Sequence, residues 1–177
     1  MSTDISNTVQ HSDFKPCPEG GQRLICCDVV DHGLQPPDRF GKIKRKGTLY
    51  WQSEHLIPEG EYAGRPFIVH RRFTMSMHEK AGLRIFINAW RGKPMTDEQA
   101  TALARDLDKL IGFNGYGQVM HVTKPRGTFA EILSMMPLPK GFEKLTIDPL
   151  YVRFKDRAPR APGAAPRTAG DDDDIPF

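Results

Sequence analysis

Long hydrophobic runs are missing from this sequence of 177 residues. No apolar stretch approaches the roughly 18 residues that a membrane-spanning helix needs. The opening segment, MSTDISNTVQHSDFKP, is polar and lacks the apolar centre of a signal peptide. We therefore expect a soluble, cytoplasmic protein without a membrane partner.

Cysteine is also scarce, and Cys17, Cys26 and Cys27 are the full set. An odd number of cysteines without a C-x2-C pair indicates reduced thiols in a reducing compartment. Cys26 and Cys27 would point to opposite faces of a strand, so we expect one of them in the core. A zinc site that combines these thiols with His11 or His32 is an alternative, but no ligand spacing supports it.

Catalytic motifs are absent: the chain has no P-loop, no H-E-x-x-H and no nucleophile elbow. The strongest enzyme alternative is a Mg²⁺-dependent nuclease that uses Asp28, Asp31 and Glu54. However, D-x-x-D on a strand sends its two carboxylates to opposite faces. We therefore expect no enzymatic activity, no cofactor and no metal.

Charge of the two signs is unevenly distributed. Residues 20–154 hold 20 Lys or Arg against 14 Asp or Glu, whereas residues 171–174 are four consecutive aspartates. A basic body joined to an acidic tail indicates a polyanionic ligand.

The sequence divides into four parts. Residues 1–20 lack periodicity and predict a flexible arm, and residues 21–154 predict the folded domain. Residues 155–170 are rich in proline and alanine and predict a disordered linker, which gives reach to a docking tip at 171–177. Within the domain, strands are expected at 22–31, 42–57, 67–76, 118–123 and 128–136. Residues 147–154 are expected to form an edge strand or an extended segment.

Two helices are predicted between the third and fourth strands. Ser76 and Glu79 have the form of a capping box, and the apolar face that follows is Leu83, Phe86, Ile87 and Trp90. Thr96 and Gln99 begin the second helix, and Gly112 suits its C-terminal cap. Its expected apolar face is Leu103, Leu107, Leu110 and Ile111.

Three strands, a helical insertion and two strands is the element order of the OB-fold, a five-stranded, partly open barrel. We therefore predict a mainly β, OB-fold-like barrel with a helical insertion. Barrels of this class bind oligonucleotides across their second and third strands and with the flanking loops.

The second strand carries the main candidates for DNA contacts. Binding a single strand without sequence preference needs cations along the phosphates and flat side chains under the bases. The predicted cations are Lys42, Lys44, Arg45 and Lys46, and Tyr50 and Trp51 follow them. Strict alternation places Tyr50 on the outer face for stacking and Trp51 in the core. A bulge at Gly47 would put the basic run and these aromatics out of phase, so both stay in the candidate set.

Further candidates lie on the third strand and in the last turn. Phe67, Val69 and Phe73 alternate as the core set, so His70 and Arg72 are expected beside Tyr50. Arg71 would then point inward, and we expect a local irregularity there. Lys124 and Arg126 are candidates for phosphate contacts from a loop.

The final residues, DDDDIPF, combine a run of carboxylates with an apolar end. They resemble the acidic tip with which bacterial single-stranded-DNA-binding proteins recruit replication and repair proteins. The resemblance implies that Asp171, Asp172, Asp173, Asp174, Ile175, Pro176 and Phe177 bind partners. A second hypothesis is that the tip folds back on the basic groove when DNA is absent.

The body, at about residues 22–140, resembles small phage proteins that accompany replication genes. RRFTMSMHEKAGLR, AWRGKPMTDEQ and MPLPKG carry this resemblance. It implies a protein that binds single-stranded DNA in replication, recombination or repair in a bacterial host, with homo-oligomers as an open option. The alternative is an adaptor that engages replication proteins through its tip without binding DNA.

Overall fold

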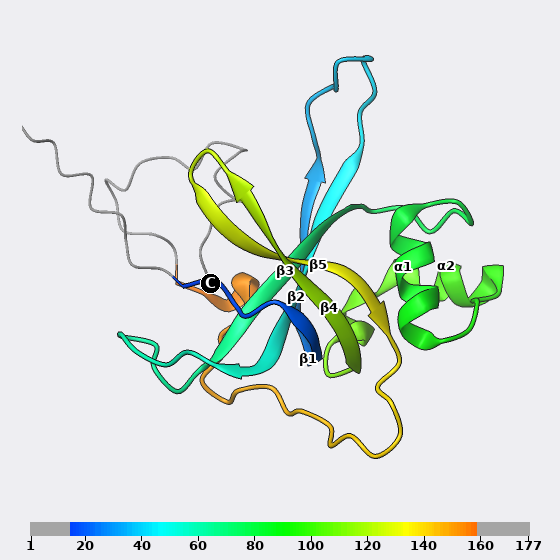
Figure 1. Cartoon of the computed structure of the whole chain (residues 1–177). Coiled ribbons are helices and arrows are strands. Elements are labelled where there is room, and N and C mark those ends of the chain that lie inside the picture. Colours follow the sequence, from blue (N-terminus) through cyan, green and yellow to red (C-terminus); the bar gives the residue numbers. More distant parts are fainter. Residues whose placement is uncertain (1–14, 159–177) are drawn as a thin grey trace, which may run out of the picture.

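The computed structural model of this chain describes residues 15–158, which fold around a closed five-stranded barrel (Figure 1). Its strands are β1 (Gly20–Leu34), β2 (Arg45–Leu56), β3 (Pro66–Thr74), β4 (Asn114–Lys124) and β5 (Gly127–Met136). They follow one another around the barrel in the order β1-β2-β3-β5-β4, and β4 pairs with β1 to close it. The predicted OB-fold-like barrel is thereby confirmed.

The register between β2 and β3 is regular from Lys46 to Gln52. The two irregularities in the β1–β2 ladder fall on β1, where Cys27 and His32 are the extra residues. Gly47, considered above as a bulge, pairs regularly with Phe73. A Cβ at Gly47 would lie 2.8 Å from the Val30 carbonyl oxygen, so close approach of the strands explains this glycine.

Trp51 is the centre of the barrel core and has no exposed surface. Its ring packs against Phe86 and Trp90 of helix α1 (Gly82–Arg91), with centroid separations of 5.7 and 5.8 Å. The core positions predicted for the third strand are also confirmed, because Phe67, Val69 and Phe73 are all buried. Burying an aromatic side chain of this size contributes a few kcal/mol, so these rings stabilise the contact between helix and barrel.

Helix α1 has the predicted apolar face but not the predicted start. Leu83, Phe86, Ile87 and Trp90 are buried, and the helix ends at Gly92 in the left-handed conformation. The capping box predicted at Ser76 and Glu79 is wrong, because α1 begins after Ala81 without a side-chain cap. The Ser76 hydroxyl instead accepts a hydrogen bond from the His78 amide in the preceding turn.

Helix α2 (Asp97–Arg105) has the predicted start but is shorter than predicted. The Gln99 amide donates to the Thr96 hydroxyl at 3.2 Å, and the Thr96 amide donates to the Gln99 side chain at 3.1 Å. This capping box is confirmed. The α-helix ends at Arg105, however, and residues Leu107–Leu110 form a separate 3-10 helix, η1. Leu103 therefore does not share one continuous helical face with Leu107 and Leu110.

Arg71 is accommodated without the irregularity that we expected on β3, because it pairs with Leu49 in regular register. Its guanidinium lies over the rings of Phe73 and Phe86, at 5.3 and 5.1 Å from their centroids. It also donates to the carbonyl oxygen of Leu133 on β5 at 2.8 Å. Since β3 and β5 share only one paired position, Arg71 fills the gap in the barrel wall between them.

After β5 the chain returns as an extended segment, here called the strap (Leu145–Arg157), which crosses the outer face of the barrel. It contains a short 3-10 helix, η2 (Phe154–Asp156), but no strand, so the extended alternative is the correct one. The buried Asp28 carboxylate on β1 anchors it by accepting bonds from the Arg153 side chain at 3.0 Å, the Tyr151 hydroxyl at 3.1 Å and the Phe154 amide at 2.8 Å. The strap is thus tied to the barrel by charge-assisted hydrogen bonds.

The two ends of the described chain are held against the barrel. Cys17, within the predicted N-terminal arm, is buried, and the carbonyl of the same residue accepts a hydrogen bond from His121. At the other end Arg157 contacts Phe154. Residues 1–14 of the arm, residues 159–170 of the linker and the tip lie outside the described residues. None of the helices in residues 15–158 combines the length and apolar character that crossing a membrane requires.

Candidate nucleic-acid interface

Strand pairing brings the predicted residues of β2 and β3 together on the outer face. Tyr50 pairs with His70, and their ring centroids lie 5.6 Å apart. Thr48 pairs with Arg72 in the same ladder. Because paired residues of an antiparallel ladder share a face, His70 and Arg72 lie beside Tyr50 as predicted.

Tyr50 is nevertheless covered and is only 3% exposed. The Phe154 ring of the strap packs on it with centroids 4.7 Å apart, and the Arg157 guanidinium lies 3.9 Å from the centroid of Phe154. A base reaches Tyr50 only if the strap moves. Trp51, the second aromatic of the candidate set, is a core residue and offers no surface for stacking.

The basic run lies in and beside the loop that joins β1 to β2. Lys42 and Lys44 precede β2, so they are loop residues instead of the strand residues that we predicted. Lys44 pairs with Asp38 at 3.0 Å, and the Arg45 guanidinium pairs with Asp31 on β1. The Arg45 hydrogen bonds lower the pKa of the Asp31 carboxyl, which is therefore ionised at neutral pH.

Phe40 stands at the tip of this hairpin and is 71% exposed. The Arg39 guanidinium lies 4.7 Å from the centroid of its ring. We did not predict Phe40 as a DNA contact. The sequence nevertheless indicated it, because an aromatic residue in a polar loop next to a basic run is a candidate for stacking on a base. Residues 31–46 hold five cations against two carboxylates, so the hairpin combines an exposed ring with net positive charge.

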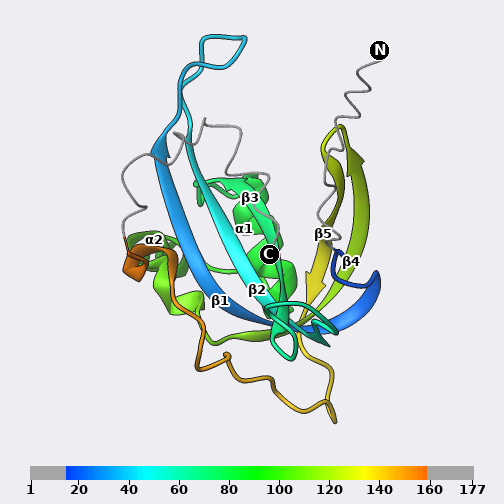
Figure 2. The ribbon, with the colours of Figure 1, turned by 90° about the vertical axis from the view of Figure 1, so that its left-hand side faces the viewer.

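Lys124 and Arg126 lie at the turn between β4 and β5, as predicted. The Lys124 ammonium pairs with Glu131 at 2.9 Å and lies 5.7 Å from the centroid of the Phe129 ring. Figure 2 shows that the β4–β5 hairpin and the β1–β2 hairpin project on the same side of the barrel. The two loops that flank the ligand face in OB-folds therefore both carry cations here.

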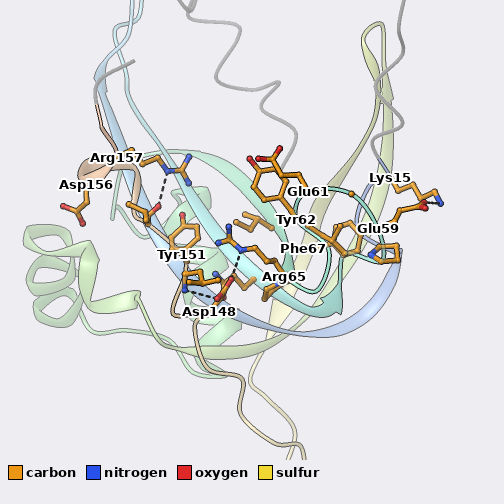
Figure 3. A pocket seen from close by; sticks show the side chains of 18 of the residues that line it. Lys15, Glu59, Glu61, Tyr62, Arg65, Phe67, Asp148, Tyr151, Asp156 and Arg157 are labelled. Carbon is orange, nitrogen blue, oxygen red and sulfur yellow. Dashed lines mark hydrogen bonds and ion pairs between the residues drawn. The ribbon is translucent and has the colours of Figure 1, made fainter. Parts of the chain in front are cut away.

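A cavity of about 730 Å³ opens on the outer face between the β2–β3 turn and the strap (Figure 3). Gln52 and Ile68 line it from the strands, and Tyr62 and Leu150 line it from the two segments. Arg65 crosses it and pairs with Asp148 of the strap at 2.9 Å. The lining of this outer-face cavity combines apolar side chains such as Phe67 and Leu150 with charged ones, a combination that is typical of ligand sites. Sequence reasoning missed it because it exists only where the strap meets the turn.

The three carboxylates that we considered for a nuclease form ion pairs with basic side chains within the described part of the chain. Asp28 is bound by Arg153, Asp31 by Arg45, and Glu54 by Arg23. In residues 15–158 no three His, Cys, Asp or Glu side chains gather as a metal site. Each of these carboxylates has a structural partner.

The cysteines are buried thiols. Burial raises the pKa of Cys17 to about 11 and that of Cys27 to about 12. The Cys17 thiol donates a hydrogen bond to the Gln22 side chain. His32, which we considered as a zinc ligand, instead forms a hydrogen bond with the Thr48 hydroxyl. These thiols are therefore protonated at neutral pH and engaged in packing.

No family model and no curated protein matches this chain. The candidate interface has a geometry of its own. That geometry is a basic, aromatic hairpin beside a barrel face that the strap partly covers. The tip at Asp171–Phe177 lies outside the described residues.

Proposed function

We propose that this protein binds single-stranded DNA without sequence specificity and recruits other proteins through its acidic tip. The observation that carries the proposal is the exposed Phe40 on a hairpin rich in cations, beside the ligand face of an OB-fold-like barrel. Rings supply stacking of about 1–3 kcal/mol per base, and cations follow the phosphates.

The proposed path of the strand begins at the β1–β2 hairpin. Lys42 and Lys46 contact phosphates there, and Phe40 stacks on a base. His70 and Arg72 continue the path on β3, at the foot of the same hairpin. Lys124 and Arg126 close it from the β4–β5 turn, which projects on the same side of the barrel.

The outer-face cavity extends this path for one base. Tyr62 is half-exposed at its mouth and Arg65 crosses it, so a base that enters meets a ring and a guanidinium. Tyr50 joins the path only when the strap lifts Phe154 away. Binding therefore has two stages: contact with the hairpins, then exchange of Phe154 for a base on Tyr50.

The tip has a different role in this proposal. Its carboxylates steer it to a basic rim on a partner, and Ile175, Pro176 and Phe177 enter an apolar pocket there. The partners are replication, recombination or repair proteins in the cytoplasm of a bacterial host, and the protein is of phage type.

A second candidate function is an adaptor that does not bind DNA. One observation favours it: the strap covers Tyr50, and Lys44 and Arg45 are neutralised by Asp38 and Asp31. In that case the barrel presents the tip, and the hairpin contacts a protein.

Anisotropy of labelled dT oligonucleotides of increasing length separates the two functions. We expect the full chain to bind, and Lys42→Glu to weaken binding several-fold through lost phosphate contact. Lys140→Glu is the matched control, because it changes the same charge in the exposed segment after β5. If wild type, Lys42→Glu and Lys140→Glu all fail to bind the oligonucleotides, the adaptor function is favoured.

A further inference from the structure

A second cavity, of about 520 Å³, lies among the helices and is here called the helical pocket. Helices α1 and α2, the 3-10 helix η1 and the segment after β5 form its walls. Its apolar lining is Ile87, Trp90, Met95, Leu103, Leu110, Phe113, Pro137 and Leu138. Phe113 is 62% exposed at the mouth. A pocket of this size accepts one large apolar side chain and its neighbours.

The rim of the helical pocket is basic. Arg91, Lys93 and Lys109 line it, and no described carboxylate does. A buried nitrogen of the Arg91 guanidinium, Nη1, has no hydrogen-bond partner within residues 15–158. A buried donor without an acceptor is costly, so an incoming carboxylate would satisfy it.

This rim differs from the hairpin. Lys44 and Arg45 on the hairpin are neutralised by aspartates, whereas no ion pair within residues 15–158 involves Arg91, Lys93 or Lys109. The helical pocket therefore fits a segment with several carboxylates next to an apolar residue. Asp171–Phe177 has this composition, with four aspartates followed by Ile-Pro-Phe.

The strap contacts the helical insertion, and the tether beyond it is long enough to bring the tip to this pocket. Arg153 of the strap pairs with Asp108 of η1 at 2.8 Å, and Lys109, next to Asp108, lines the pocket. Figure 1 shows the orange end of the described chain across the barrel from α2, so the tether has to cross the domain to reach the pocket. The 13 Cα–Cα steps from Ala158 to Asp171 span at most about 45 Å, which exceeds the about 40 Å width of a domain of this size. Such a tether gives a millimolar effective concentration.

We infer that the helical pocket is a binding site for the tip of the same chain. The tip's carboxylates meet Arg91, Lys93 and Lys109, and Phe177 enters between α1 and α2. The tip is thus stored on the helical insertion, away from the hairpins, until a partner takes it. This inference does not depend on DNA binding by the hairpins, because it rests on the pocket and the tail alone.

Photo-cross-linking of the full chain tests this site. Phe177 is replaced by p-benzoylphenylalanine, the protein is irradiated without DNA, and the products are mapped by mass spectrometry. We expect cross-links within one chain to Met95, Leu103 or Leu138. Lys93→Glu should lower the cross-linked fraction roughly tenfold, because like charges then face each other.

Lys80→Glu is the matched control, because Lys80 is exposed and does not line the pocket, and it should leave the yield unchanged. Cross-links on β2 or β3, cross-links mainly between two chains, or no cross-links at all would overturn the inference. Equal yields from Lys93→Glu and Lys80→Glu would do the same. DNA is absent from every arm, so this failure is distinct from a failure to bind oligonucleotides.

Discussion

Arg153→Ala should release the strap and expose the outer face of the barrel. Arg153 donates to Asp28 at 3.0 Å and forms a double hydrogen bond with Asp108 at 2.8 and 2.9 Å. Asp28 is only 1% exposed, so the substitution leaves a buried carboxylate without its cation. Breaking such a pair costs about 3–5 kcal/mol. Lifting the strap lets water reach the Asp28 carboxylate. We therefore expect Arg153→Ala to raise the population in which the strap is detached, with the rest of the barrel still folded.

The Cys27 thiol reports this opening. Cys27 is buried next to Asp28, to which the strap is bonded, and burial raises the pKa of this thiol to about 12. Alkylation of Cys27 thus requires an open strap, and its rate follows the open population. At about 3 kcal/mol, and tenfold for each 1.4 kcal/mol, Arg153→Ala should speed alkylation of Cys27 roughly 100-fold.

Lys155→Ala is the matched control, since Lys155 is exposed and lies 3.5 Å from the same Asp108. An exposed pair contributes about 0–1 kcal/mol, so Cys27 should react at most about fivefold faster in this variant. Cys26, in the core, should stay protected in both variants. Equal alkylation of Cys27 in wild type and Arg153→Ala would refute the assignment of Arg153 as the anchor of the strap.

Three other perturbations have defined outcomes. Phe40→Ala should weaken binding of dT oligonucleotides by about 1–3 kcal/mol, measured by anisotropy, with the melting temperature unchanged because the ring is exposed. Thr96→Ala should cost about 1 kcal/mol through loss of the capping box, or about 4 °C in the melting temperature. The Arg153 hydrogen bonds lower the pKa of Asp108 below its unfolded value near 4, so their stabilisation is complete at neutral pH. It should be lost as the pH falls through the lowered pKa, which hydrogen exchange of residues 150–157 would detect.

Each of these has a control and a contradicting result. Phe142→Ala removes another half-exposed ring, and binding that weakens equally in both Phe variants would remove Phe40 from the proposed path. Ser76→Ala should lower the melting temperature less than Thr96→Ala, because Ser76 caps no helix and accepts only one long hydrogen bond, from the His78 amide at 3.3 Å. Arg153→Ala should abolish the loss of protection at acid pH, because Asp108 then lacks the Arg153 hydrogen bonds. A loss of the same size in that variant would show that these bonds are not its cause.

The barrel was predictable because alternation and turn residues act locally. Phe67, Val69 and Phe73 recur at odd positions and His70, Arg72 and Thr74 at even ones, so the core face of β3 follows from the period of two. The same holds for Thr96 and Gln99, whose mutual hydrogen bonds involve only the first turn of α2. Ser76 and Glu79 have the same spacing, but the turn after β3 delays α1 until Gly82.

The covered state of Tyr50 was not predictable, because it depends on a segment about 100 residues away. In the sequence, Asp28 is only one carboxylate of a D-x-x-D pair. The fold brings Arg153 and Phe154 to it, and these contacts make it the anchor of the strap. The outer-face cavity and the helical pocket are likewise products of tertiary packing. Phe40 differs from the two cavities, because its position in a polar loop beside lysines predicts an exposed ring from the sequence alone.

A salt titration of oligo-dT binding by the full chain tests the central claim most directly. If about five phosphates are neutralised, log K should fall against log salt with a slope of about −3.5, at about −0.7 per contact. Saturable binding in dilute buffer with such a slope is the predicted result. A protein that leaves oligo-dT unbound even at the lowest salt concentration would contradict the claim that this barrel holds single-stranded DNA.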